Sequence, residues 1–203
     1  MSAFNLVDWI LTIAAIIVSW QLHSAVLRQP PTATPAQSAL PGGGSAPPVS
    51  RQPVTLEERL ERVHAAGGYR ELADFLRGAT LAYEEIVMAF ARGDLQDVLP
   101  LLGPAVREAF ARAIADRQER GESLSTTVIG VAAEPVDAGI DGGTAWLEVR
   151  FATELVSAST DREGRLIGGD PRHVAEVAEV WTFSRDVASL DPNWTLVATD
   201  EDG

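Results

Sequence analysis

The sequence predicts an α+β domain, with helices first and an antiparallel sheet after them, carried on an N-terminal membrane helix and a flexible linker. Apolar residues recur at helical spacing between residues 55 and 118, and they alternate with period two between residues 123 and 199. Short turns separate the alternating segments, and strands joined by short turns pair antiparallel. Helices followed by such a meander form an α+β arrangement.

Residues 1–28 are the candidate membrane anchor. The window from Trp9 to Leu27 carries no charge, and the 20 residues from Ala3 to Leu22 would reach about 30 Å as a helix. A cleaved signal peptide is an alternative, although no basic residue precedes the apolar run. An interfacial helix is another, although the run lacks a charged face. The residues expected in the anchor are Trp9, Ile10, Leu11, Ile13, Ile16, Ile17, Val18 and Trp20.

The flanking charges predict the orientation of this anchor. Asp8 precedes the apolar run and Arg28 follows it, which places the C-terminal side in the cytoplasm by the positive-inside rule. Residues 29–53 form the predicted linker, because ten of these 25 residues are Pro or Gly and few are apolar. The globular domain is therefore expected over residues 54–203.

Four helical segments open the domain. The first, Thr55 to Ala66, has a capping box of Thr55 and Glu58, and it either packs on the domain or serves as a mobile arm for a partner. The others are a long central helix, a short helix and a helix whose arginines alternate with acids on a solvated face. They span Glu71–Ala91, Leu95–Leu102 and Ala105–Gln118.

Four strands follow, over Ser123–Ala132, Ala145–Ser157, Val174–Arg185 and Asn193–Thr199. Asp191-Pro192-Asn193 is turn chemistry and predicts a terminal hairpin. On the second strand, Glu148, Arg150 and Glu154 share a face and predict a cross-strand charge ladder.

Aromatic residues are the candidate partner or pocket surface. Trp181 and Phe183 share a strand face with Glu179 and Arg185, so this face is either an exposed aromatic patch or plain core. The candidate residues are Trp146, Phe151, Trp181, Phe183, Arg185 and Trp194.

Composition excludes several functions. The chain has no Cys, its three His residues lie far apart, and no phosphate-binding loop or nucleophile elbow is present, so we expect no catalytic, cofactor-binding or metal-binding residues. Residues 54–203 hold 28 acidic residues against 14 Arg, a net charge of −14. Phosphate backbones would repel such a domain, which argues against nucleic acid as a partner.

The stretch EVWTFSRDVASLDPNWTLVAT, residues 179–199, resembles the C-terminal signature of the Tim44-like domain family. VRFATEL, residues 149–155, and the helical segment around Tyr83 are also similar, so the resemblance covers about residues 72–199. It implies a nuclear transport factor 2-like cone, with N-terminal helices on a curved sheet of about four strands. Bacterial members sit at the inner membrane, and the best-known member tethers the mitochondrial import motor to its translocase.

The resemblance implies a non-enzymatic adaptor, single-pass in the bacterial inner membrane, with its soluble domain facing the cytoplasm. Its partners would be the lipid bilayer and a protein of the translocation or membrane-protein biogenesis machinery, with no cofactor. One alternative is a small-molecule-binding or isomerase-type enzyme, because folds of this type often enclose an apolar pocket. Another is an envelope protein whose domain only dimerises.

Overall fold

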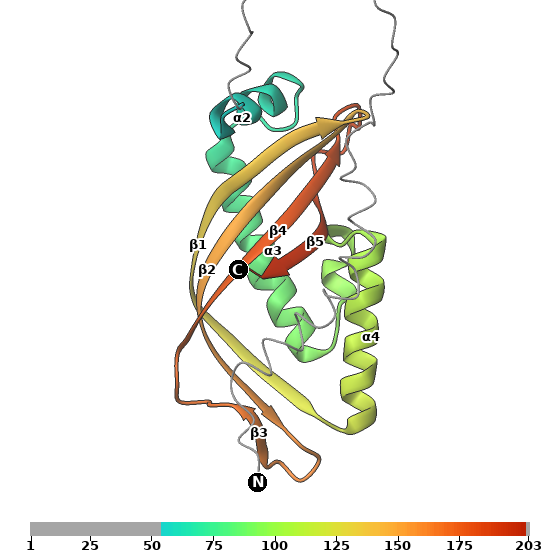
Figure 1. Ribbon diagram of the computed structural model, residues 1–203. Coiled ribbons are helices and arrows are strands. Elements are labelled where there is room, and N and C mark those ends of the chain that lie inside the picture. Colours follow the sequence, from blue (N-terminus) through green and yellow to red (C-terminus); the bar gives the residue numbers. More distant parts are fainter. Residues whose placement is uncertain (1–53, 202–203) are drawn as a thin grey trace, which may run out of the picture.

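The computed structural model describes residues 54–201 (Figure 1). The predicted anchor, residues 1–28, and the predicted linker, residues 29–53, lie outside the described residues. Within residues 54–201, none of the helices combines the length and the apolar character needed to cross a bilayer.

The helical half of the domain follows the predicted order: α2, α3, the 3-10 helix η1, and α4. Thr55 caps α2 as expected: its hydroxyl accepts from the Glu58 amide at 3.2 Å, and the Glu58 carboxylate accepts from the Thr55 amide at 3.0 Å. The bounds of the four elements are Leu56–Ala65, Leu72–Arg92, Gln96–Leu101 and Pro104–Arg120.

The second half forms an antiparallel sheet in the order β1-β2-β4-β5, in which the short β3 pairs with β2 beside this path. Sequence analysis predicted about four strands and missed β3, whose two glycines gave no alternating pattern. The β4–β5 pairing confirms the predicted terminal hairpin. The strands span Ser123–Asp141, Thr144–Thr160, Leu166–Gly169, Ala175–Asp186 and Thr195–Glu201.

The first strand is longer than predicted. We expected it to end at Ala132, but β1 continues to Asp141 and pairs with β2 along its whole length. Its register shifts between Val128 and Gly130 and again between Pro135 and Asp137, and each shift disrupts the alternation that the prediction relied on. Pro135 is tolerated because β1 is an edge strand of the described sheet.

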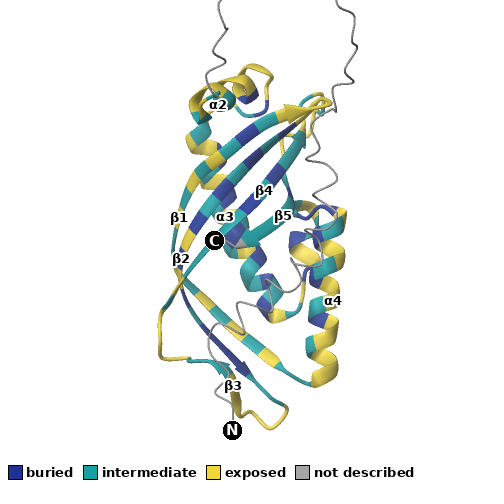
Figure 2. Ribbon diagram, viewed as in Figure 1, coloured by how far each residue is buried: buried dark blue, intermediate teal, exposed yellow. Residues whose placement is uncertain are grey.

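The core lies between α3 and the concave face of the curved sheet (Figure 1). Buried residues concentrate along the middle strands and along the facing side of α3 (Figure 2). On β2 the predicted alternation is confirmed, since every second residue from Ala145 to Leu155 is buried. A helix stripe packed on one sheet face therefore provides the main apolar stabilisation of the domain.

The first helix packs on the domain. Val63 of α2 is completely buried, and Arg59 forms an ion pair with Asp137 of β1. These contacts favour the packed alternative over the mobile arm.

One arginine of α4 agrees with the expected solvated face and another differs from it. The Arg112–Glu108 pair is present at 2.9 Å, as the i,i+4 spacing predicts. Arg117, however, lies over the Phe90 ring and donates to the carbonyls of Phe90 and Ala91. It thus adds a donor at the C-terminal end of α3, where the Phe90 carbonyl also accepts from the Gly93 amide at 3.1 Å. Local sequence spacing cannot reveal this contact.

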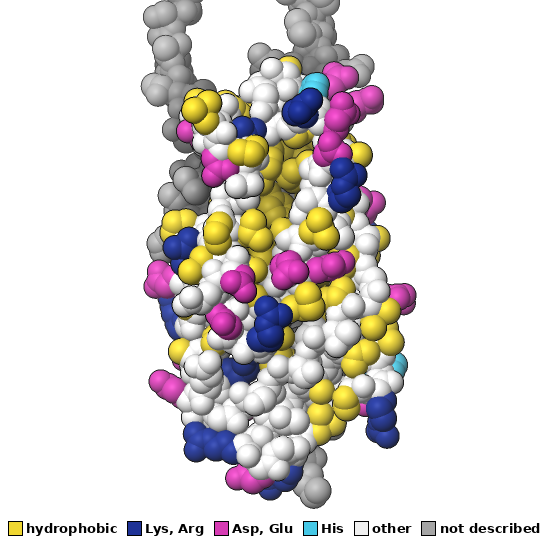
Figure 3. Space-filling view, turned by 180° about the vertical axis from the view of Figure 1, so that it is seen from behind, with side chains coloured by type: hydrophobic (Ala, Val, Ile, Leu, Met, Phe, Trp, Pro, Cys, Tyr) yellow, Lys and Arg dark blue, Asp and Glu magenta, His cyan; other side chains and the backbone are white. Residues whose placement is uncertain are grey.

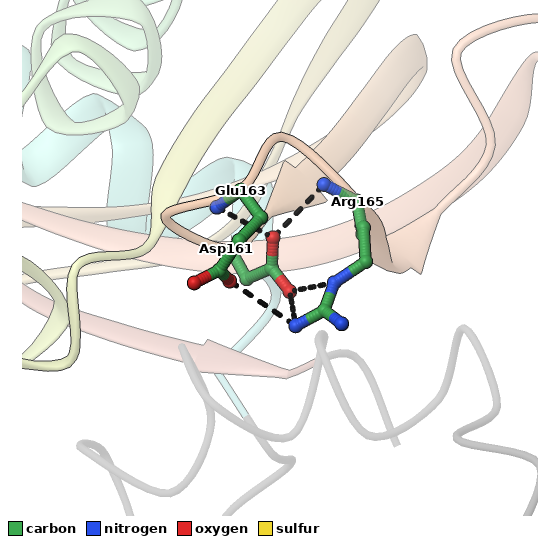
Figure 4. A network of polar contacts seen from close by, with 3 residues as sticks. All are labelled: Asp161, Glu163 and Arg165. Atoms are coloured by element: carbon green, nitrogen blue, oxygen red, sulfur yellow. Dashed lines mark hydrogen bonds and ion pairs between the residues drawn. The ribbon is translucent and has the colours of Figure 1, made fainter.

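The β2–β3 turn is a compact polar network (Figure 4). The Asp161 carboxylate accepts from the Glu163 amide at 3.0 Å and from the Arg165 amide and Nε at 2.9 and 2.7 Å. The adjacent Arg162 donates to the Glu119 carbonyl at 2.7 Å, so the turn is attached to the C-terminal end of α4.

Candidate functional site

Three of the six candidate surface residues belong to the core. Phe151, Trp181 and Phe183 have exposed fractions of at most 3%, and the rings of Phe151 and Trp181 lie 4.5 and 4.6 Å from the ring of Tyr83 on α3. Of the two alternatives for Trp181 and Phe183, plain core is therefore confirmed, and these residues do not form an exposed patch. Alternation placed both rings on one face of β4, and the tertiary fold turns that face toward the helices.

The two other candidate tryptophans, Trp146 and Trp194, lie outside this fully buried aromatic cluster. Trp194 is half-buried and packs edge-on against Phe75, with ring centroids 4.9 Å apart. Trp146 lies on the opposite face of the sheet, with its ring over Gly139 of β1. Four residues further along the same face, Arg150 and Glu134 form a 3.1 Å ion pair, which supports the predicted charge ladder.

Arg185 joins two distant segments. Its guanidinium donates to the carbonyls of Gly67 and Gly68 at 2.9 Å each, and to those of Asp191 and Ser189 at 3.1 and 3.2 Å. It therefore ties the α2–α3 turn to the β4–β5 hairpin. A guanidinium with four backbone acceptors is occupied by the fold itself, so Arg185 is a structural residue here rather than part of a partner surface.

A buried polar cluster lies within the aromatic core. The Tyr83 hydroxyl donates to the Glu179 carboxylate at 2.8 Å. Burial raises the pKa of Tyr83 strongly, and the negative charge of Glu179 raises it further. The Thr153 hydroxyl is close enough to influence this pKa, yet among the described residues neither Thr153 Oγ1 nor Trp181 Nε1 has a hydrogen-bond partner.

This cluster can offer hydrogen bonds, and its phenol cannot act as a general base near neutral pH. A phenol with a raised pKa stays protonated, so its hydroxyl can donate or accept a hydrogen bond but is not available as tyrosinate. Among the described residues, no group of three or more His, Asp or Glu side chains is placed to hold a metal ion. The two unpartnered polar atoms are the feature that a small ligand could satisfy.

A surface pocket of about 600 Å³ lies between α2 and the first turn of α3, and sequence analysis did not predict it. Its floor is apolar, formed by Leu56, Leu60, Tyr69 and Leu72, and its rim is formed by Glu57, Glu61, His64, Arg70 and Glu71. The Tyr69 hydroxyl donates to the Leu60 carbonyl at 2.9 Å, which holds the ring in the floor.

The sequence carried a local signal for this pocket. Leu56 and Leu60 stand four residues apart on α2, and Glu57 and Glu61 form a second row beside them. Helical spacing predicts these two rows, but it does not show that Val63, rather than the leucines, faces the sheet. The gap that leaves the leucines half-exposed depends on how α2 meets α3.

The sequence was compared with known proteins. A search of curated proteins gives no match. Among solved structures, the intermembrane-space region of the chloroplast protein ARC6 aligns with a TM-score of 0.46 and 16% identity, over 62% of this chain and 95% of that chain. A conserved protein from Planctomyces limnophilus aligns with a TM-score of 0.35 and 21% identity, over 64% and 96%.

The comparison with family models is decisive. The Tim44-like domain model matches residues 62–201, which is 140 of the 203 residues and includes α3, α4 and all five strands. The matched span contains the terminal hairpin and the aromatic core described above. The chain therefore belongs to the Tim44-like domain family.

Proposed function

We propose that this protein is a non-enzymatic, membrane-anchored adaptor that acts at the cytoplasmic face of the bacterial inner membrane. The observation that carries this proposal is the Tim44-like domain, joined through residues 29–53 to the apolar segment of residues 1–28. The partners would be the lipid bilayer and a protein of the translocation or membrane-protein biogenesis machinery.

The described domain supports a binding role. Its concave face is filled by its own aromatic side chains, and the pocket between α2 and α3 opens to solvent at the end where the linker enters. As a flexible coil, 25 residues would span roughly 25–30 Å, which keeps the domain close to the bilayer without fixing its orientation.

The test is crosslinking in isolated membranes that contain the full-length protein. The chain has no Lys, so a zero-length carbodiimide joins its carboxylates only to amines of other proteins or to its own N-terminus. The matched control carries Ile13→Arg and Ile17→Arg, substitutions that are costly at the centre of a membrane helix. We expect the wild type, but not the control, to be crosslinked to translocase subunits or nascent membrane proteins. The absence of such crosslinks would contradict the proposed adaptor function.

A second candidate function is small-molecule binding, including isomerase-type chemistry, at the buried polar cluster around Tyr83. It is favoured by the unpartnered, buried Thr153 Oγ1 and Trp181 Nε1 beside Tyr83. Native mass spectrometry of the full-length protein in mild detergent discriminates the two functions. A stoichiometric small molecule that is lost in Thr153→Val would favour this second function.

A further inference from the structure

We propose that the pocket between α2 and α3 binds a peptide segment that carries a bulky apolar side chain flanked by Arg or Lys. This inference rests on the proposed adaptor function, because it states the chemistry of the protein segment that the adaptor would hold.

The floor of the pocket fits an apolar anchor. Leu56, Leu60 and Leu72 are half-buried, so their exposed parts offer apolar surface that a bound side chain would remove from water. Tyr69 is fixed from both sides, by its hydrogen bond to Leu60 and by a ring contact with the core residue Phe75 at 6.4 Å. The floor is thus preformed, which lowers the ordering cost of binding.

The rim selects the charge of the partner. Three carboxylates, from Glu57, Glu61 and Glu71, surround the floor with a single guanidinium, that of Arg70, which leaves a net charge of −2. Within residues 54–201, no cation lies at ion-pair distance from these three carboxylates. Figure 3 shows acidic side chains gathered over this end of the molecule, beside a strip of apolar surface.

Two other charged residues of α2 are engaged elsewhere. Glu58 is used in the capping box, and Arg59 pairs with Asp137 on the side away from the pocket. The acidic rim is therefore available for a partner, and the negative domain around it attracts a basic segment from a distance.

The test is a titration of the full-length protein, in a nonionic detergent, with a fluorescent peptide that has two Leu one helical turn apart between pairs of Arg. We expect Glu57→Gln with Glu61→Gln to weaken binding about five-fold at low salt, because each partly exposed charge pair contributes modestly. The difference should shrink at high salt.

The matched control is Glu85→Gln with Glu119→Gln, which removes the same charge from exposed positions on α3 and α4. It should change the affinity less than two-fold. Equal weakening in both double variants, or no binding by the wild type, would overturn the proposal. A Lys-containing form of the peptide should also crosslink by carbodiimide to Glu57, Glu61 or Glu71, and crosslinks confined to other acids would contradict it.

The two proposals can fail separately. If crosslinking in membranes finds a translocation partner but the peptide does not bind, the pocket assignment is wrong and the adaptor remains. If the peptide binds but no partner is found, the adaptor is wrong and the pocket is still a peptide site.

Discussion

At the scale of single residues, Tyr83 is the point at which the aromatic core meets the polar cluster. Its ring stacks on Phe151 with an interplanar angle of 24°, and its hydroxyl donates to Glu179. The only other tyrosine of the chain, Tyr69, holds the pocket floor. Each phenol therefore reports on one of the two candidate sites.

We expect neither tyrosine to ionise with an ordinary pKa. Burial raises the pKa of both, and a carboxylate raises each further, Glu61 for Tyr69 and Glu179 for Tyr83. Because the folded-state pKa of each tyrosine is raised, folding favours the protonated phenol. The contribution of each phenol to folding stability is therefore fully present below the unfolded pKa of about 10 and is lost as pH rises through the folded-state pKa. Tyrosinate absorbance during an alkaline titration should show Tyr69 ionising first and Tyr83 only as the protein unfolds.

The variant Tyr83→Phe provides the control for this titration. It should lose the late step and keep the early one. A step with an ordinary pKa that disappears in Tyr83→Phe would show that Tyr83 is exposed to solvent, against the burial described here.

At the scale of elements, the turn between α2 and α3 positions the pocket. Gly67 has a left-handed φ of 81°, with free space around it, whereas Gly68 is packed against Val63 and Ala145. The carbonyls of both glycines accept from Arg185. The turn thus sets the angle of α2 through backbone conformation at one residue and through close packing at the next.

Alanine at these two adjacent positions separates the two effects. Gly67→Ala should lower the free energy of unfolding by about 1–2 kcal/mol, the cost of a left-handed side chain. Gly68→Ala should cost more, about 2–3 kcal/mol, because a Cβ there would lie 2.5 Å from Val63 Cγ1 and 2.9 Å from the Val63 carbonyl. Denaturant unfolding followed by tryptophan fluorescence measures both; a neutral Gly68→Ala would mean that the turn does not pack as described.

At the scale of the whole molecule, the described domain begins almost directly after the Pro- and Gly-rich segment. Val54 is the first described residue, and α2 starts at Leu56. The residues before it contain only two basic side chains, Arg28 and Arg51, both flanking the apolar or Pro-rich stretches. This arrangement predicts where a protease specific for Arg would first cut.

Brief digestion of the full-length protein with trypsin should cut after Arg51 and leave a resistant fragment that starts at Gln52. The physical reason is that cleavage needs an accessible extended backbone, which a Pro-rich linker offers and packed helices and strands do not. Intact mass and N-terminal sequencing identify the fragment. First cuts within residues 54–201 would contradict the domain boundary.

Local signals in the sequence determined most of the element list. The Thr55–Glu58 capping box and the apolar stripe of α3 each depend on residues a few positions apart, and the structure confirms both. The terminal hairpin is also confirmed, but its turn lies at Val187-Ala188, and the Asp191 carboxylate accepts from the Asn193 amide within the following loop. The family resemblance read from the terminal hairpin is confirmed in the same way. Such signals can be recognised in a single sequence because the geometry of helices, strands and turns fixes the spacing of their residues.

Only the tertiary structure decided which faces are buried and which residues meet. Alternation showed that Trp181 and Phe183 share a face, but the packing of α3 made that face the core. Arg185 finds two of its four acceptors 117 and 118 residues away. The pocket depends on the angle at which α2 meets α3. These features arise from contacts between distant segments, and local periodicity carries no information about such contacts.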